Sequence, residues 1–256
     1  MTEIQQAKSG AHEPIAIIGI ACEFAGGISS PFDLWHALVN SQDVGSEIPI
    51  ERFDIHSHSA HMMNQDNGEL RKRLVHRGYF LPSSKWDTFE PSFFGLSDGE
   101  AATVDPCHRL LLHKFVHLVD DAGYSLDRVR GSRTSVHIGQ FSISHQEATL
   151  NLKPEFRTRL HGPNIMLYNA AARLSYHFDL HGPNLSFDVA CSSSLQAVHM
   201  AIQTLRSGEA DMAVAGGVNA FYTPVSHLNI TLLGAISVDG RSRSFSTDAN
   251  GYAKGN

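Results

Sequence analysis

Residues 185–208, LSFDVACSSSLQAVHMAIQTLRSG, carry a strand pattern and a helix pattern on either side of one cysteine. Apolar and polar residues alternate over 185–189, which predicts a short strand. Leucine, valine and isoleucine then recur at helical spacing, which predicts a helix from about 192 to 207 with Gly208 just beyond its end. Cys191 therefore falls at the turn between a strand and the first turn of a helix.

That position suits a nucleophilic cysteine. The first turn of a helix carries backbone N–H groups without intrahelical partners and a partial positive charge, and both stabilise a thiolate. The same N–H groups can stabilise an oxyanion. The hydroxyl side chains at 192–194 can also cap a helix start. The alternative is that Cys191 is a small buried residue with no chemical role, as free cysteines most often are.

The chain around this stretch alternates strands with helices. The patterns predict strands over 15–21, 134–138 and 212–215, and helices near 32–39, 110–119 and 164–178. The run over 15–21 is continuously apolar, which is typical of a strand buried on both faces. Residues 41–100 read as a long loop anchored by aromatic side chains, and residues 1–13 as a disordered leader. The pattern predicts an α/β fold with a mainly parallel sheet.

Several segments, taken in order, resemble the β-ketoacyl synthase (ketosynthase) domains of polyketide synthases and animal-type fatty acid synthases. The most specific is DVACSSSLQAVH at 188–199, around Cys191. The others are EPIAIIGIAC at 13–22, IPIERFD at 48–54, the aromatic stretch at 89–101, DPCHRLLL at 105–112, RLSY at 173–176 with LHGPN at 180–184, AGGVN at 215–219, and residues 237–244 with 248–255. The resemblance covers residues 14–256, which are identified as the N-terminal part of such a domain.

The resemblance implies a thiolase-like fold, in which layers are stacked α-β-α-β-α and two copies pair as a homodimer. It implies that Cys191 accepts an acyl group from the phosphopantetheine arm of an acyl carrier protein. A malonyl-type extender then loses carbon dioxide and attacks that thioester in a decarboxylative Claisen condensation. No metal and no bound cofactor are expected, because the substrates arrive on phosphopantetheine.

In the family, two histidines from H-G-T-G-T and N-x-G-H motifs stabilise the charge that develops on the extender. Neither motif occurs in these 256 residues. The C-terminal half of the fold is therefore expected to be missing, and this chain is not expected to condense acyl groups alone. Cys107 and His108 also depart from the family pattern, in which glutamine is commoner at both positions.

Composition excludes several other classes of protein. The net charge is -6 and the longest basic run is Arg71, Lys72 and Arg73, so a nucleic-acid surface is not expected. Residues 212–238 lack charged side chains but are broken by asparagines and a proline, which disfavours a membrane span. The start of the chain lacks the apolar core of a signal peptide. With three widely spaced cysteines, a reducing cytoplasm is the expected location.

Two histidine patterns do not predict catalysis or metal binding. His113 and His117 have the spacing of zinc ligands on a helix, but Lys114 stands where a metalloprotease has its glutamate, and a third ligand is not evident. His199 lies about two helical turns beyond Cys191, too far to take the thiol proton. The glycine pairs at 26–27 and 216–217 lack the rest of a phosphate-loop motif, so tight backbone packing explains them better.

Three functional hypotheses follow. The chain is a piece of a condensing enzyme, a cysteine acyltransferase or hydrolase that acts without condensation, or a non-catalytic remnant used for dimerisation or carrier-protein docking.

Overall fold

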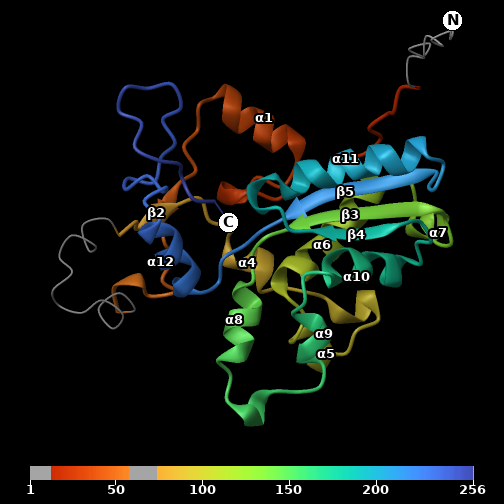
Figure 1. Cartoon of the computed structure of the whole chain (residues 1–256), viewed down its shortest axis with the longest axis horizontal. Helices are drawn as coiled ribbons and strands as arrows, with labels where there is room; N and C mark the ends of the chain where they lie inside the picture. The colour runs from red at the N-terminus through yellow and green to blue at the C-terminus, as the bar shows by residue number, and fades with distance from the viewer. Residues whose placement is uncertain (1–12, 58–73, 256) are drawn as a thin grey trace, which may run out of the picture.

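The computed structural model describes residues 13–57 and 74–255. Its centre is a three-stranded parallel sheet in the order β4-β3-β5, where β3 is Thr134–Gln140, β4 is Asn184–Phe187 and β5 is Met212–Val218. Figure 1 shows these strands side by side with their carboxyl ends at the same edge. The predicted strands at 134–138, 185–189 and 212–215 are confirmed to within a few residues.

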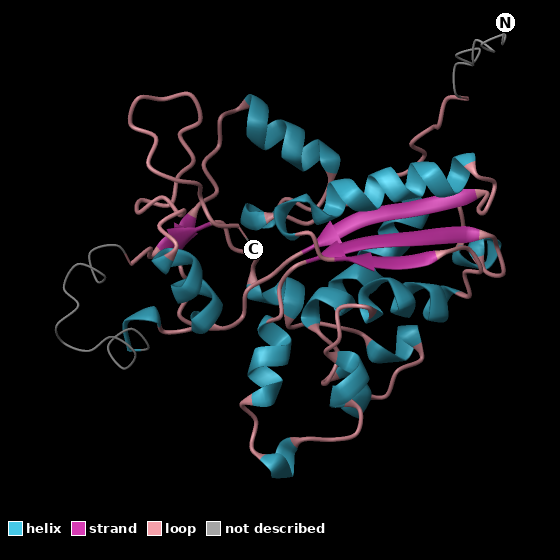
Figure 2. Ribbon diagram, in the orientation of Figure 1, coloured by secondary structure: helices cyan, strands magenta, loops and turns pink. Residues whose placement is uncertain are grey.

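Helices cover both faces of the sheet. Helix α11 (Ser193–Arg206) packs on one face against β3 and β5, and α10 (Asn169–Phe178) packs on the other against β3 and β4. Helix α6 (Pro106–Asp121) packs against α10. Figure 2 shows the resulting helix-sheet-helix arrangement. Because β3 is central and covered on both faces, it is buried along its whole length.

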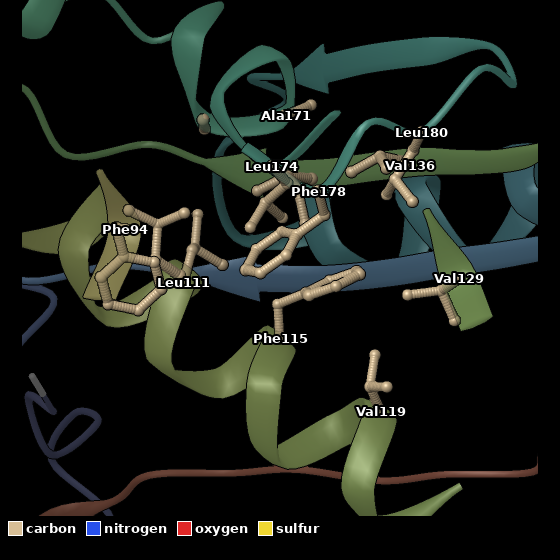
Figure 3. Packing of buried hydrophobic residues seen from close by; sticks show 13 residues of the cluster. Phe94, Leu111, Phe115, Val119, Val129, Val136, Ala171, Leu174, Phe178 and Leu180 are labelled. Carbon is tan, nitrogen blue, oxygen red and sulfur yellow. The ribbon is translucent and has the colours of Figure 1, made fainter. Parts of the chain in front are cut away.

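The main hydrophobic core lies between the sheet and α6. Phe115 of α6 stacks on Phe178 of α10 with ring centroids 4.2 Å apart. Phe94 meets the same Phe178 ring edge-on at 6.4 Å. Figure 3 shows these rings with the aliphatic side chains that surround them. The buried members of the cluster are Phe94, Leu111, Leu112, Phe115, Val119, Val129, Val136, Ile138, Ala170, Ala171, Leu174, Phe178 and Leu180.

Shorter elements complete the chain. The predicted helix near 32–39 is present as α1 (Pro31–Val39), capped by Ser30, whose hydroxyl accepts from the Asp33 N–H at 3.1 Å. The long loop predicted over 41–100 contains several short helices and strands. The remaining elements of the described residues are β1 (Ser46–Glu47), β2 (Arg77–Gly78), α4 (Ser83–Trp86), α5 (Asp98–Ala101), α7 (Leu126–Val129), α8 (Ser144–Leu150), α9 (His161–Asn164), α12 (Pro224–Leu232) and 3-10 turns at Ala25–Gly27, Pro91–Phe94, Pro154–Phe156 and Ala190–Ser192.

The strand predicted over 15–21 is wrong. Residues 13–24 have no regular structure, and Ile17 is 81% exposed. The segment lies across the end of α6, where the Ile20 N–H donates to Asp121 Oδ2 at 2.7 Å. A strand needs a neighbour for its N–H and C=O groups, and no other described strand pairs with this segment.

Two other predictions concern the start of the chain and a membrane span. The predicted leader falls almost wholly on residues 1–12, which lie outside the described part of the chain. In the described residues, no helix has the length and apolar character that crossing a membrane requires.

Candidate active site

Cys191 lies in a sharp turn between β4 and α11, as predicted. β4 ends at Phe187, a 3-10 turn spans Ala190–Ser192, and α11 begins at Ser193. Ala190 adopts a left-handed conformation with φ of 55°. This conformation costs a non-glycine residue about 1–2 kcal/mol. The turn leaves Cys191 exposed at the carboxyl edge of the sheet, where ligands of open α/β sheets bind.

Short hydrogen bonds hold this turn in place. Ser193 Oγ accepts from the Val189 N–H at 2.8 Å and donates to the Ala190 carbonyl at 2.7 Å. Ser192 Oγ donates to the Val189 carbonyl at 2.9 Å. The Ala190 N–H donates to Asp188 Oδ1 at 3.1 Å. The strained conformation of Ala190 is thus fixed by bonds from both sides.

The serines do not cap α11 in the predicted way. Ser192 is the N-cap residue, but its side chain forms no capping hydrogen bond. Its hydroxyl and that of Ser193 instead bond back to the turn. The serines therefore stabilise the turn, and the side chain of the N-cap residue does not occupy the first N–H groups of α11. Such N–H groups can bind the carbonyl oxygen of an acyl group on Cys191.

Two glycines let the start of α11 approach the sheet closely. A Cβ atom on Gly139 of β3 would lie 2.5 Å from the carbonyl carbon of Ser193. A Cβ atom on Gly217 of β5 would lie 2.6 Å from Cβ of Ser194. The tight packing predicted for Gly217 is confirmed, whereas a Cβ on Gly216 would meet only Ile138 Cδ1, at 3.7 Å. Gly139 was not among the predicted residues, although a glycine at the end of a buried strand signals such close approach.

The three cysteines have different environments. Cys191 is exposed, Cys22 is half-buried and Cys107 is buried. Burial raises the pKa of the Cys22 thiol, and it raises the pKa of the Cys107 thiol well above its ordinary value. Because a thiolate is the reactive form, burial disfavours Cys22 and Cys107 as nucleophiles.

A surface groove of about 430 Å³ runs along α11 from Ser192 to Ile202. Its lining includes Leu195, which is 71% exposed, and Val198, which is 42% exposed. His199 also lines the groove, but no hydrogen bond joins it to Cys191 in the described part of the chain. The apolar side of α11 next to Cys191 is therefore open in this chain.

His113 and His117 do not form a ligand pair. The ring of His113 packs edge-on against Phe89 and Phe94, at 5.4 and 5.5 Å. His117 Nδ1 lies 3.3 Å from the Lys114 ammonium, which forms an ion pair with Glu23 at 2.7 Å. Burial, and then the charge of Lys114, lower the pKa of His117. The described residues hold no group of three or more histidine, cysteine, aspartate and glutamate side chains that could bind a metal ion.

The structure is an α/β fold built on a parallel sheet, with an exposed cysteine at a strand-to-helix turn. The model of the β-ketoacyl synthase N-terminal domain matches residues 12–256. The chain belongs to this family, and its fold is the N-terminal part of a thiolase-like ketosynthase domain.

The chain is similar in sequence to fungal polyketide synthases. The chain is 37% identical over 247 residues to fusarielin synthase FSL1 of Gibberella zeae, covering 95% of this chain and 9% of that protein. It is 36% identical over 244 residues to the polyketide synthase component of the compactin nonaketide synthase of Penicillium citrinum, covering 95% and 8%. The chain thus spans under a tenth of the length of these relatives.

Solved structures of similar fold are ketosynthase domains. An oxazolomycin ketosynthase domain of Streptomyces albus superposes with a TM-score of 0.80 at 32% identity, over 94% of this chain and 40% of that chain. The ketosynthase from module 6 of the bacillaene synthase of Bacillus subtilis gives 0.78 at 29% identity, over 94% and 38%. The chain therefore corresponds to about two fifths of these ketosynthases.

Proposed function

We propose that Cys191 accepts the acyl group that a polyketide ketosynthase condenses with its extender. In this step the thiolate of Cys191 attacks a thioester on the phosphopantetheine arm of an acyl carrier protein. The new Sγ–acyl bond replaces the bond to the carrier sulfur, which leaves as a thiol after taking up a proton. The observation that carries this proposal is the exposed cysteine at the start of α11, beside N–H groups suited to an oxyanion.

Condensation is proposed for the whole synthase rather than for these 256 residues. Decarboxylation of a malonyl-type extender needs hydrogen-bond donors for the carbonyl on which charge develops. The family's two histidine motifs for this task do not occur in residues 1–256. We therefore expect this chain to form the acyl-enzyme without forming a new carbon-carbon bond.

Acyl loading can be tested by mass spectrometry. The chain is incubated with an acyl-pantetheine thioester, and the mass added to the intact protein is assigned to a residue by peptide mapping. We expect one acyl group on Cys191, none after Cys191→Ala, and unchanged loading after Cys22→Ala. Equal loading of the Cys191→Ala variant would refute Cys191 as the acyl acceptor. It would favour the hypothesis of a non-catalytic role in docking or dimerisation.

Release of the loaded acyl group separates an acyltransferase or hydrolase from a partial condensing enzyme. We expect the thioester on Cys191 to persist in buffer, because the proposed reaction ends at the acyl-enzyme. Repeated release of free acid, followed over several turnovers by chromatography, would favour the hydrolase reading instead. The Cys191→Ala variant is the control for spontaneous hydrolysis of the thioester.

We also propose that two copies pair through the outer edge of β4. This strand pairs with β3 on one side only, among the described strands, and Leu185 on it is 38% exposed. Tyr168 and Tyr176, beside this edge, are 62% and 84% exposed. An unpaired edge with apolar side chains is a template for another strand. Leu185→Lys is expected to convert dimers to monomers in analytical ultracentrifugation, whereas Leu150→Lys on α8 is expected to leave them intact.

The proposed setting is the cytoplasm, with an acyl carrier protein as the partner and without bound metal or cofactor. Three free cysteines are compatible with a reducing compartment. The net charge of -6 does not favour nucleic acid as a partner.

A further inference from the structure

A buried hydrogen-bond network joins the start of α6 to the ends of β3 and β5. His108, in the first turn of α6, meets Gln140 of β3 through Nε2 and Oε1, 3.1 Å apart. The amide of Gln140 donates to Asp105 Oδ2 and to the Ser142 carbonyl, both at 3.2 Å. The Ser142 N–H in turn donates to Asn219 Oδ1, just after β5, at 2.8 Å. Side chains from three elements thus fix the point where β3 ends.

Within this network His108 acts as a neutral hydrogen-bond donor. It is 1% exposed, and burial lowers its pKa to about 4. The charge of nearby Arg173 lowers this pKa further, while Asp105 opposes the shift. Since the amide nitrogen of Gln140 already donates twice, its oxygen must accept from Nε2–H of His108. His108 Nδ1 is then unprotonated, and it has no hydrogen-bond partner among the described residues.

The network lies one residue from Gly139, which contacts the start of α11 near Cys191. Gly139 precedes Gln140, and the backbone of Ser193 rests on it so closely that even a Cβ atom would not fit. A rotation of the Gln140 peptide therefore moves the surface on which the start of α11 lies. Ser193 in turn holds Val189 and Ala190, the residues that precede Cys191.

We propose that His108 is a positioning residue for Cys191, acting through Gln140 and Gly139 on the start of α11. The proposal rests on the nucleophile assignment under the proposed function. Histidine and glutamine side chains can each donate one N–H to the oxygen of Gln140. A residue that cannot donate leaves that oxygen buried without a partner, which favours a shift of the end of β3.

The test is the rate at which iodoacetamide alkylates each cysteine of the whole chain, followed by peptide mass spectrometry. His108→Leu is expected to slow alkylation of Cys191 by about two- to fivefold, the range that loss of a helix-terminus interaction with a thiolate gives. His108→Gln is expected to leave the alkylation rate of Cys191 at its wild-type value. His108→Asn, whose amide is too short to reach Gln140, provides a second variant should His108→Leu fold poorly.

Cys22 and Cys107 are internal controls for loosening of the structure. The proposal requires that Cys22 react at its wild-type rate and that Cys107 stay protected in the variants. An unchanged rate at Cys191 in His108→Leu and His108→Asn overturns it, and so does parallel exposure of Cys107, which indicates a purely structural role. Alkylation needs no acyl substrate, so failure of acyl loading with intact His108 dependence would count against the proposed function alone.

Discussion

At the scale of single residues, the backbone of Ala190 decides how Cys191 is presented. Its φ of 55° turns the chain between the end of β4 and the start of α11. An alanine tolerates this conformation at modest cost, whereas a β-branched side chain clashes with its own backbone there. The exposure of Cys191 therefore depends on a small residue before it.

Substitutions at Ala190 test this dependence. Ala190→Val is expected to lower the alkylation rate of Cys191 at least severalfold, because the valine drives position 190 out of the left-handed region. Ala190→Gly is expected to keep the rate near wild type, since glycine adopts positive φ freely. The exposed Ala148→Val on α8 controls for valine in a helix. Equal rates for the valine and glycine variants of Ala190 would contradict the role of its conformation.

The place of Cys191 at a strand-to-helix turn could be predicted from sequence, but its surroundings only in part. The alternation before Cys191 and the helical spacing after it depend on neighbours along the chain, which a sequence displays directly. The positive φ of Ala190 and the hydrogen bond from the Ser193 hydroxyl to the Ala190 carbonyl depend on the three-dimensional conformation of the turn. Gly139 lies far from Cys191 in sequence, and only the parallel sheet brings the two regions together.

At the scale of elements, the close approach of α11 to the sheet positions the turn that carries Cys191. The helix packs on β3 and β5 through Gly139 and Gly217, where side chains would hold it away. A neighbouring glycine, Gly216, has ordinary space around it. These two kinds of glycine provide a matched pair of positions for substitution by alanine.

Gly139→Ala is expected to displace the start of α11, because its Cβ would lie 2.5 Å from the carbonyl carbon of Ser193. Overpacking of this kind costs about 1–3 kcal/mol, measured as the free energy of unfolding in urea. Acyl loading of Cys191 should fall with it. Gly216→Ala, whose Cβ would lie 3.7 Å from Ile138 Cδ1, should retain both stability and loading. Comparable loss in both variants would show that contact with α11 is not the cause.

Long periodic elements were predictable, whereas short or unpaired ones were not. The predicted helix over 110–119 lies within α6 (Pro106–Asp121). The apolar run over 15–21 has the composition of a buried strand but lacks a neighbouring strand in the described chain. Helices α8 and α12 were missed because their apolar residues do not form a clear helical stripe.

At the scale of the whole molecule, several large apolar side chains are exposed on different elements. Ile17, Trp35 of α1 and Leu195 of α11 each expose more than half of their surface. Exposed apolar side chains of this size can form interaction sites or promote aggregation. Above the concentrations at which it forms dimers, the chain alone is therefore expected to aggregate in light-scattering measurements, whereas Leu195→Lys does not aggregate. Similar scattering by both proteins would show that the surface of α11 is not the cause.

Buried basic groups should make the stability of the molecule depend on pH. Burial lowers the pKa of His108 and of His227 to about 4, from 6.5, and that of Lys254 to about 7, from 10.5. Because the folded pKa values are the lower ones, the unfolded chain binds protons more tightly. The free energy of unfolding must then decrease as the pH is lowered. Lys254 causes this decrease between pH 10.5 and pH 7, and the two histidines cause it between pH 6.5 and pH 4.

Protonation of each histidine is expected to lower the free energy of unfolding by about 3 kcal/mol between pH 6.5 and pH 4, because a shift of one pKa unit corresponds to about 1.4 kcal/mol. Urea unfolding at pH 7.5 and pH 5 should show the decrease. His227→Gln should reduce it, because glutamine can still donate to the Val75 carbonyl that His227 Nε2 meets at 2.7 Å but does not titrate. Substitution of the exposed His181 by glutamine is the control, and an equal pH dependence in both variants would mean that burial of His227 does not govern the acid sensitivity.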